Sequence, residues 1–95
     1  MKKAVIIRCD KPINFETLEE DEKKVRKLIC RLIAHDKIFD FYCKYEENYN
    51  KLILFILFEL KNNIKKIKIH TIIPKANDIR DCGYIISLSD SYKIL

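Results

Sequence analysis

Seven consecutive apolar residues, from Leu52 to Phe58, form the longest uninterrupted apolar run in this chain of 95 residues. A run of this length is typical of a buried strand or of part of a buried helix, and hydrophobic periodicity does not separate the two. The run is rich in Ile and Phe, and Asn-containing turn formers flank it at residues 48–50 and 62–63. These features favour a central β-strand at residues 52–60, which is too short to be a membrane-spanning helix.

Residues 17–35 carry the clearest helical pattern in the chain. Thr17 and Glu20 match a capping box, acidic residues fill the first turn, and basic residues follow towards the C-terminal end. Apolar residues at helical spacing predict one face that packs on a sheet. The residues of this face are Leu18, Val25, Ile29, Leu32 and Ile33.

Alternating apolar and polar residues predict further strands around these two elements. The predicted strands are residues 3–9, 38–46, 52–60, 64–73 and 84–89, with a hairpin turn at residues 47–50 and a loop at residues 75–83. The expected fold is therefore α+β, with one long helix packed on a mostly antiparallel five-stranded sheet in the order β-α-β-β-β-β. If residues 50–62 are helical instead, the order becomes β-α-β-α-β-β.

Length and composition indicate one ordered domain that spans residues 1–95. Apolar residues make up 48% of the chain and charged residues 35%, which is typical of a globular protein rather than a disordered one. The first residues contain too short an apolar stretch for a signal peptide, so we expect an intracellular protein. The four cysteines form no C-x-x-C pair, so we expect reduced thiols rather than a disulfide framework.

One helix covers only one face of a five-stranded sheet, and this predicts an exposed apolar patch on the other face. The expected patch consists of Ile53, Phe55 and Leu57 from the central strand, joined by Tyr42. Exposed patches of this kind usually mark an interface with another protein. One hypothesis is therefore a protein-interaction module, either a homodimer or a small regulator or inhibitor of a larger complex.

The positive charge of the chain is concentrated in one segment. Residues 60–77 contain five lysines and no acid, whereas the rest of the chain carries equal numbers of acidic and basic residues. This surplus predicts nucleic-acid binding, with Tyr49 or Tyr84 as stacking residues. Lysines on an edge strand also prevent sheet-to-sheet pairing, which is the alternative interpretation. The predicted nucleic-acid-binding residues are Lys61, Lys65, Lys66, Lys68, His70 and Lys75.

The sequence predicts no metal site, no cofactor and no membrane partner. The possible soft ligands lack the close spacing of zinc sites. They are Cys9, Cys43, Cys82, His35 and His70. The chain has a single glycine and contains no phosphate-binding loop or nucleophile elbow. We therefore expect a small basic non-catalytic binding module without catalytic residues, and a small ribonuclease that uses His70 is the weaker alternative.

Overall fold

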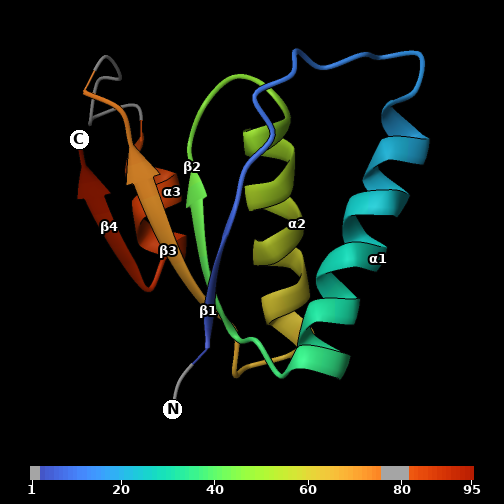
Figure 1. The fold of residues 1–95 in the computed structure, drawn as a ribbon. Helices are drawn as coiled ribbons and strands as arrows, with labels where there is room; N and C mark the ends of the chain where they lie inside the picture. Colours follow the sequence, from blue (N-terminus) through green and yellow to red (C-terminus); the bar gives the residue numbers. More distant parts are fainter. Residues whose placement is uncertain (1–2, 76–81) are drawn as a thin grey trace.

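The computed structural model describes residues 3–75 and 82–95, and in these residues the fold is α/β. Four parallel strands lie in the spatial order β1-β2-β3-β4, and a helix follows each of the first three (Figure 1). The elements are β1 (Ala4–Ile7), α1 (Leu18–Asp36), β2 (Asp40–Lys44), α2 (Tyr49–Asn63), β3 (Lys68–Ile73), α3 (Gly83–Leu88) and β4 (Ser91–Ile94). The predicted long helix on a mostly antiparallel five-stranded sheet is therefore wrong. A helix between each pair of successive strands allows neighbouring strands to run in the same direction.

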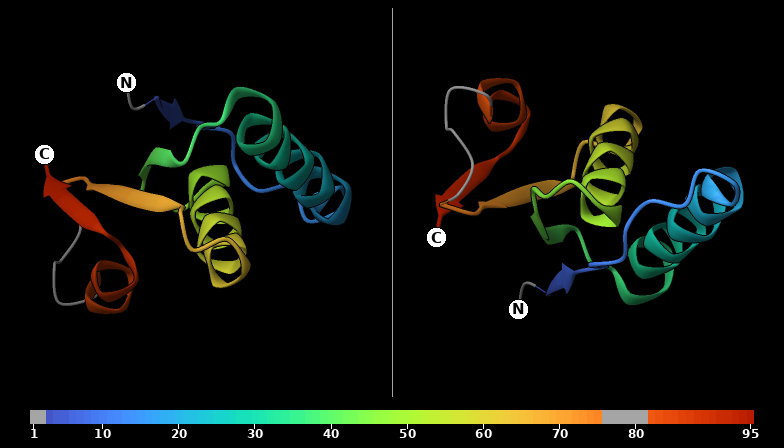
Figure 2. Two further views of the ribbon diagram at one scale, coloured as in Figure 1. Left: turned by 90° about the horizontal axis from the view of Figure 1, so that it is seen from below. Right: turned by 90° about the horizontal axis from the view of Figure 1, so that it is seen from above.

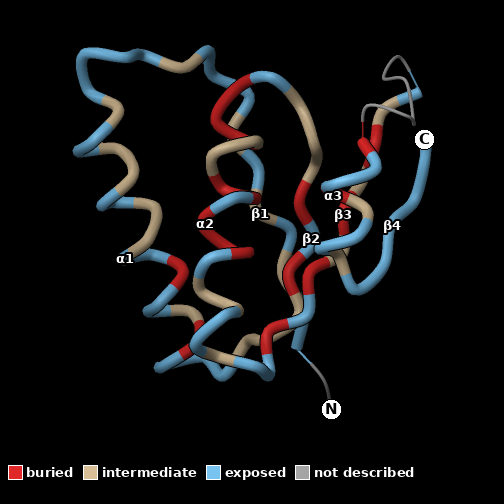
Figure 3. Tube along the Cα trace, turned by 180° about the vertical axis from the view of Figure 1, so that it is seen from behind, coloured by how far each residue is buried: buried red, intermediate tan, exposed pale blue. Residues whose placement is uncertain are grey.

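All three helices lie on the same side of the twisted sheet (Figure 2). The two central strands turn alternate residues towards the helices, so that Phe41, Cys43 and Ile69 are fully buried. Ile29 from α1 and Ile85 from α3 join the same apolar core. Burial is concentrated along α2 and the middle strands, whereas the outer side of α1 and all of β4 are exposed (Figure 3).

The apolar run that was predicted to be a central strand lies in the helix α2. The side chain of Asn48 accepts a hydrogen bond of 2.9 Å from the backbone N–H of Asn50, so the expected hairpin turn is the N-terminal cap of a helix. The helix packs against β2, β3 and α1, and this explains why most of its circumference is apolar. The alternative with helical residues 50–62 is closer, although it lacks α3 and β4.

The helix predicted at residues 17–35 is confirmed, because α1 spans Leu18–Asp36. Its predicted capping box does not form. The Thr17 hydroxyl donates instead to the Asp21 carboxylate at 2.8 Å. At the other end, Lys37 adopts the left-handed conformation, with φ 55° and ψ 39°. This conformation ends the helix and directs the chain into β2.

The last part of the chain also departs from the prediction. The strand expected at residues 84–89 is the helix α3, and residues 91–94 form β4 beside β3. A short run with two apolar Ile residues fits a helix of six residues as well as a strand, and the burial of Ile85 against the core decides between them. Most of the loop predicted at residues 75–83 falls at residues 76–81, outside the described residues.

Candidate functional site

The sheet has one face without a helix over it in the described part of the chain, and we call this the open face. Parallel register brings residues of neighbouring strands into rows, and one row runs from Ile6 through Tyr42 and His70 to Ser91. Parallel sheets are normally covered on both faces, so an uncovered face with an exposed isoleucine is unusual. The side chain of Ile6 is 70% exposed and that of Tyr42 is 38% exposed. The open face consists of Ala4, Ile6, Asp40, Tyr42, Lys44, Lys68, His70, Ile72, Ser91 and Lys93.

Four side chains at the centre of the open face hold one another in place. His70 lies 3.0 Å from the Asp40 carboxylate through Nε2, and 2.6 Å from the Ser91 hydroxyl through Nδ1. Its ring also stacks on Tyr42, with centroids 4.5 Å apart and an angle of 23° between the ring planes. The imidazole is therefore fixed by contacts from β2 and β4, and it covers one face of the Tyr42 ring.

Positive charge gathers at the amino ends of the strands, next to this group of side chains. Lysines from the start of β1, the end of α1, the α2–β3 connection and β3 surround a cavity of about 460 Å³. The other lining residues are Phe39, whose ring lies 5.6 Å from the ammonium nitrogen of Lys66, and Asp40. We call the lysines the basic cluster. Its members are Lys3, Lys37, Lys65, Lys66 and Lys68.

The structure divides the lysines of the predicted binding segment. Lys65, Lys66 and Lys68 belong to the basic cluster, whereas Lys61 pairs with the Asp90 carboxylate and Lys75 follows the opposite end of β3. His70 lies on the open face beside the cluster. Lys3 and Lys37 were missed, because their proximity depends on which strands are neighbours. Only their positive charge was visible in the sequence.

Asp90 compensates part of the predicted lysine charge. Burial by itself raises the pKa of its carboxyl group, but hydrogen bonds from Lys61 and from the Ile69 backbone N–H, together with the charges of Lys61 and Lys68, hold that pKa below its usual range. Asp90 therefore remains ionised and neutralises Lys61. Lys68 is farther from Asp90 than Lys61 is, with its Nζ 3.9 Å from the carboxylate oxygen.

The predicted apolar interface is divided by the helical structure of α2. Ile53 and Leu57 are buried in the core, so neither offers surface to a partner. Phe55 lies on the outer side of α2 and is 39% exposed. Tyr42 is on the open face, on the side of the sheet opposite to α2. A helix spreads successive residues around its circumference, whereas the strand prediction placed these three α2 residues on one face.

The two tyrosines predicted to stack on bases have different surroundings. Tyr49 is buried, and its hydroxyl donates to the Asp21 carboxylate at 2.5 Å. A hydrogen bond from Tyr49, and to a lesser extent one from Thr17, holds the pKa of Asp21 below its usual range. Tyr84 is exposed on α3. Tyr49 is therefore unsuited to stacking on a ligand, whereas Tyr42 is a partly exposed aromatic residue on the open face.

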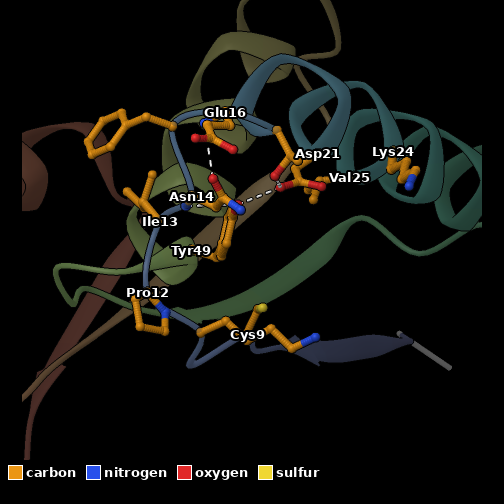
Figure 4. Close-up of a pocket in the computed structure, with 12 residues that line it drawn as sticks. Cys9, Pro12, Ile13, Asn14, Glu16, Asp21, Lys24, Val25 and Tyr49 are labelled. Carbon is orange, nitrogen blue, oxygen red and sulfur yellow. Dashed lines mark hydrogen bonds between the residues drawn. The ribbon is translucent and has the colours of Figure 1, made fainter.

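A second cavity, of about 910 Å³, lies at the carboxyl end of β1, between the loop after β1 and the start of α1 (Figure 4). Ligands of α/β proteins often bind at this end of the strands. Its tyrosine, aspartate and asparagine side chains are, however, already engaged in hydrogen bonds within the cavity wall. Tyr49 bonds to Asp21 and to the Asn14 backbone N–H, and the Asn14 side chain bonds to the Glu16 backbone N–H. We therefore place the candidate site on the open face.

The possible metal ligands differ in their surroundings. Cys43 and Cys82 are buried, Cys9 borders the second cavity, and His35 is exposed at the end of α1. Burial raises the pKa of the Cys43 thiol to about 12, so this group stays protonated. Among the described residues, no three His, Cys, Asp or Glu side chains are grouped so that they could hold a metal ion.

Comparison with models of protein families, with curated proteins and with solved structures finds no match to this chain. Within residues 3–75 and 82–95, none of the helices combines the length and apolarity needed to cross a bilayer.

Proposed function

We propose that this protein binds single-stranded nucleic acid, with phosphates at the basic cluster and bases against the Tyr42–His70 stack. One observation carries the proposal. Five lysines gather at the end of an uncovered sheet face that also presents an exposed aromatic ring. Asp40 links the two parts, because it lines the cavity of the basic cluster and bonds to His70.

The charge of the basic cluster suits phosphate because little of it is compensated. Within the described part of the chain, Lys3, Lys37 and Lys65 form no ion pair. The single acid of the cavity, Asp40, is engaged with His70. Clustered lysines attract the phosphate backbone, and their binding releases condensed counterions, which favours association at low salt.

The aromatic stack favours a single strand over a duplex. His70 stacks on one face of the Tyr42 ring, and Tyr42 is exposed enough to meet a base. Stacking of a base on an aromatic side chain contributes about 1–3 kcal/mol, and a duplex does not offer its bases in this way. The open face contains no Arg, Asn or Gln, which are the usual readers of base edges, so we expect binding that is largely independent of sequence.

Fluorescence anisotropy with labelled single-stranded RNA and DNA tests the proposal. We expect binding near 50 mM salt that weakens steeply towards about 200 mM, because five phosphate contacts correspond to a slope of about −3.5 in log affinity against log salt concentration. Replacing Lys65 and Lys66 together by Glu should lower the affinity at least ~10-fold and flatten the slope. Unchanged affinity in this double variant would refute the proposal.

A matched control separates the position of the charge from its total. Lys23 and Lys27 are exposed on α1, outside the basic cluster, and replacing both by Glu changes the net charge by the same amount. We expect a much smaller loss of affinity in this control. Equal losses in both double variants would indicate non-specific attraction by the net charge of +5. Cleavage of the RNA during the titration would favour the ribonuclease alternative.

A second copy of the chain is the other candidate for covering the open face. The exposure of Ile6 favours this alternative, because an isolated apolar side chain beside Tyr42 gains from contact with a like surface. Light scattering over a range of concentrations distinguishes the two. A stable dimer whose dissociation is required for nucleic-acid binding would assign the open face to self-association.

A further inference from the structure

We propose that Ser91 is a nucleophile activated by His70, which Asp40 orients, and that Ser91 accepts the acyl group of small carboxylic esters. The three side chains come from the adjacent strands β2, β3 and β4 and form one hydrogen-bonded chain. A hydroxyl next to a base that a third group orients is the arrangement by which proteins activate serine. The inference shares His70 with the proposed nucleic-acid site, but it does not require that nucleic acid binds.

The hydrogen bonds determine where the proton of the imidazole lies. A carboxylate only accepts hydrogen bonds, so the Asp40 contact at 3.0 Å places the proton of the neutral imidazole on Nε2. Nδ1 is then an acceptor, and the Ser91 hydroxyl donates to it at 2.6 Å. The Ser91 hydrogen therefore already points at the group that has to remove it.

The surrounding residues hold Asp40 and His70 in place and leave the Ser91 hydroxyl accessible. His70 and Asp40 are only 20% and 18% exposed, and the Tyr42 ring stacks on the imidazole. Ser91 is exposed, on the edge strand β4. Side chains on strands are held more rigidly than side chains on loops, so the base stays aligned with the hydroxyl while the oxygen is open to a substrate.

The reaction balances with an ester and water as the only reactants. The Ser91 Oγ attacks the carbonyl carbon and its proton passes to His70 Nδ1. The bond from carbon to the alcohol oxygen then breaks, and that oxygen takes the proton from Nδ1. Water, deprotonated by the same nitrogen, then attacks the acyl carbon, the bond from that carbon to Ser91 Oγ breaks, and this oxygen recovers the proton from Nδ1. Lys68 and Lys93 lie on the open face, two residues along the strands from His70 and Ser91, and their charges favour the oxyanion.

The other two serines of the chain provide internal controls. Ser87 is exposed on α3, and its hydroxyl donates to the Tyr84 carbonyl at 2.7 Å. Ser89 donates to the Ile85 carbonyl at 2.7 Å and also contacts Thr71. Neither serine contacts an imidazole, so only Ser91 should show raised reactivity.

The test uses a fluorophosphonate probe and 4-nitrophenyl acetate on the full chain. We expect a fluorophosphonate adduct that mass spectrometry locates on Ser91, and ester hydrolysis that disappears in Ser91→Ala but persists in Ser87→Ala. His70→Gln should lower the rate ~100-fold or more. Asp40→Asn should lower kcat with little change in KM, because Asp40 is a positioning residue that acts through His70. Circular dichroism checks that each variant is folded.

Several outcomes would overturn the inference. They are adducts distributed equally over Ser87 and Ser91, hydrolysis that survives Ser91→Ala, or an undiminished rate in folded His70→Gln. Nucleic-acid titration of Ser91→Ala keeps the two proposals apart. We expect Ser91→Ala to lose hydrolysis and to keep nucleic-acid binding. We expect the Lys65 and Lys66 double variant to lose nucleic-acid binding and to keep hydrolysis.

Discussion

Asn50 is completely buried, and its side chain connects the start of α2 to the segment that follows β1. Its Oδ1 accepts a hydrogen bond of 2.8 Å from the Cys9 backbone N–H, and its Nδ2 donates to the Asp10 carboxylate at 2.9 Å. The bond to Asn50 is also the largest cause that lowers the pKa of Asp10. One side chain thus fastens the end of β1 to the start of α2.

Replacing Asn50 by Leu should lower the free energy of unfolding by about 1–3 kcal/mol. The substitution leaves the partly buried Cys9 backbone N–H and the Asp10 carboxylate without their partner, and loss of such hydrogen bonds costs about this much. Urea denaturation monitored by circular dichroism measures the change. Asn62→Leu, at an exposed position of the same helix, is the matched control and should have little effect. Equal stability of the Asn50 variant and the parent would show that the connection is dispensable.

Asp90 makes the stability depend on acid. Because its pKa is lower in the folded state than in the unfolded chain, the carboxylate stabilises the protein above about pH 4, and this contribution is lost as the pH falls through the folded pKa. Its side chain is 22% exposed, so we expect Asp90→Asn to cost about 1 kcal/mol at neutral pH. Denaturation midpoints of both proteins should converge as the pH falls through the folded pKa of Asp90. A difference that stays constant throughout the acid range would contradict this assignment.

At the scale of single elements, the end of α1 contains a strained residue within the candidate site. Lys37 has φ 55°, a conformation that costs a residue with a side chain about 1 kcal/mol and costs glycine almost nothing. Lys37→Gly should therefore raise the thermal midpoint while lowering nucleic-acid affinity, since Lys37 belongs to the basic cluster. Calorimetry and anisotropy measure the two effects. Lys27→Gly, in the middle of the helix, should instead destabilise the protein.

The helix α2 predicts different costs for two adjacent apolar residues. Leu54 is completely buried, so Leu54→Ala should destabilise the protein by about 2–5 kcal/mol. Phe55 is partly exposed and makes an edge-to-face contact with Phe58, so we expect Phe55→Ala to cost less than about 2 kcal/mol. Chemical denaturation provides both values. If both variants lost a similarly large part of the free energy of unfolding, both sides of this segment would have to be covered.

The same helix shows where sequence reasoning succeeded and where it failed. The charge polarity and the single apolar face identified α1 from the sequence. A helix with one side in solvent has apolar residues at a clear helical spacing. Other elements cover α2 on several sides, so apolar residues occupy most of its positions. The spacing of apolar residues that distinguishes a helix from a strand is therefore weak. Asn48 then looked like a turn residue, although it caps a helix.

At the scale of the whole molecule, the question is what covers the open face. Ile6→Lys adds a cation beside Tyr42 at a position that is largely exposed, so the stability should hardly change. If nucleic acid covers this face, we expect tighter binding and a salt slope that is steeper by about 0.7. Thermal melts, anisotropy and analytical ultracentrifugation together decide the outcome. Dissociation of an oligomer in this variant, without any gain in binding, would assign the face to a second copy.

The sequence by itself determined the helix α1, the surplus of positive charge and the presence of apolar segments that need burial, because each of these is a local property of adjacent residues. The tertiary structure alone decided that the strands are parallel and that α2 is a helix. It also brought Lys3 and Lys37 to the lysines before β3, and Asp40 and Ser91 to His70. These groupings depend on strand order and register, which are set by long-range packing rather than by neighbouring residues.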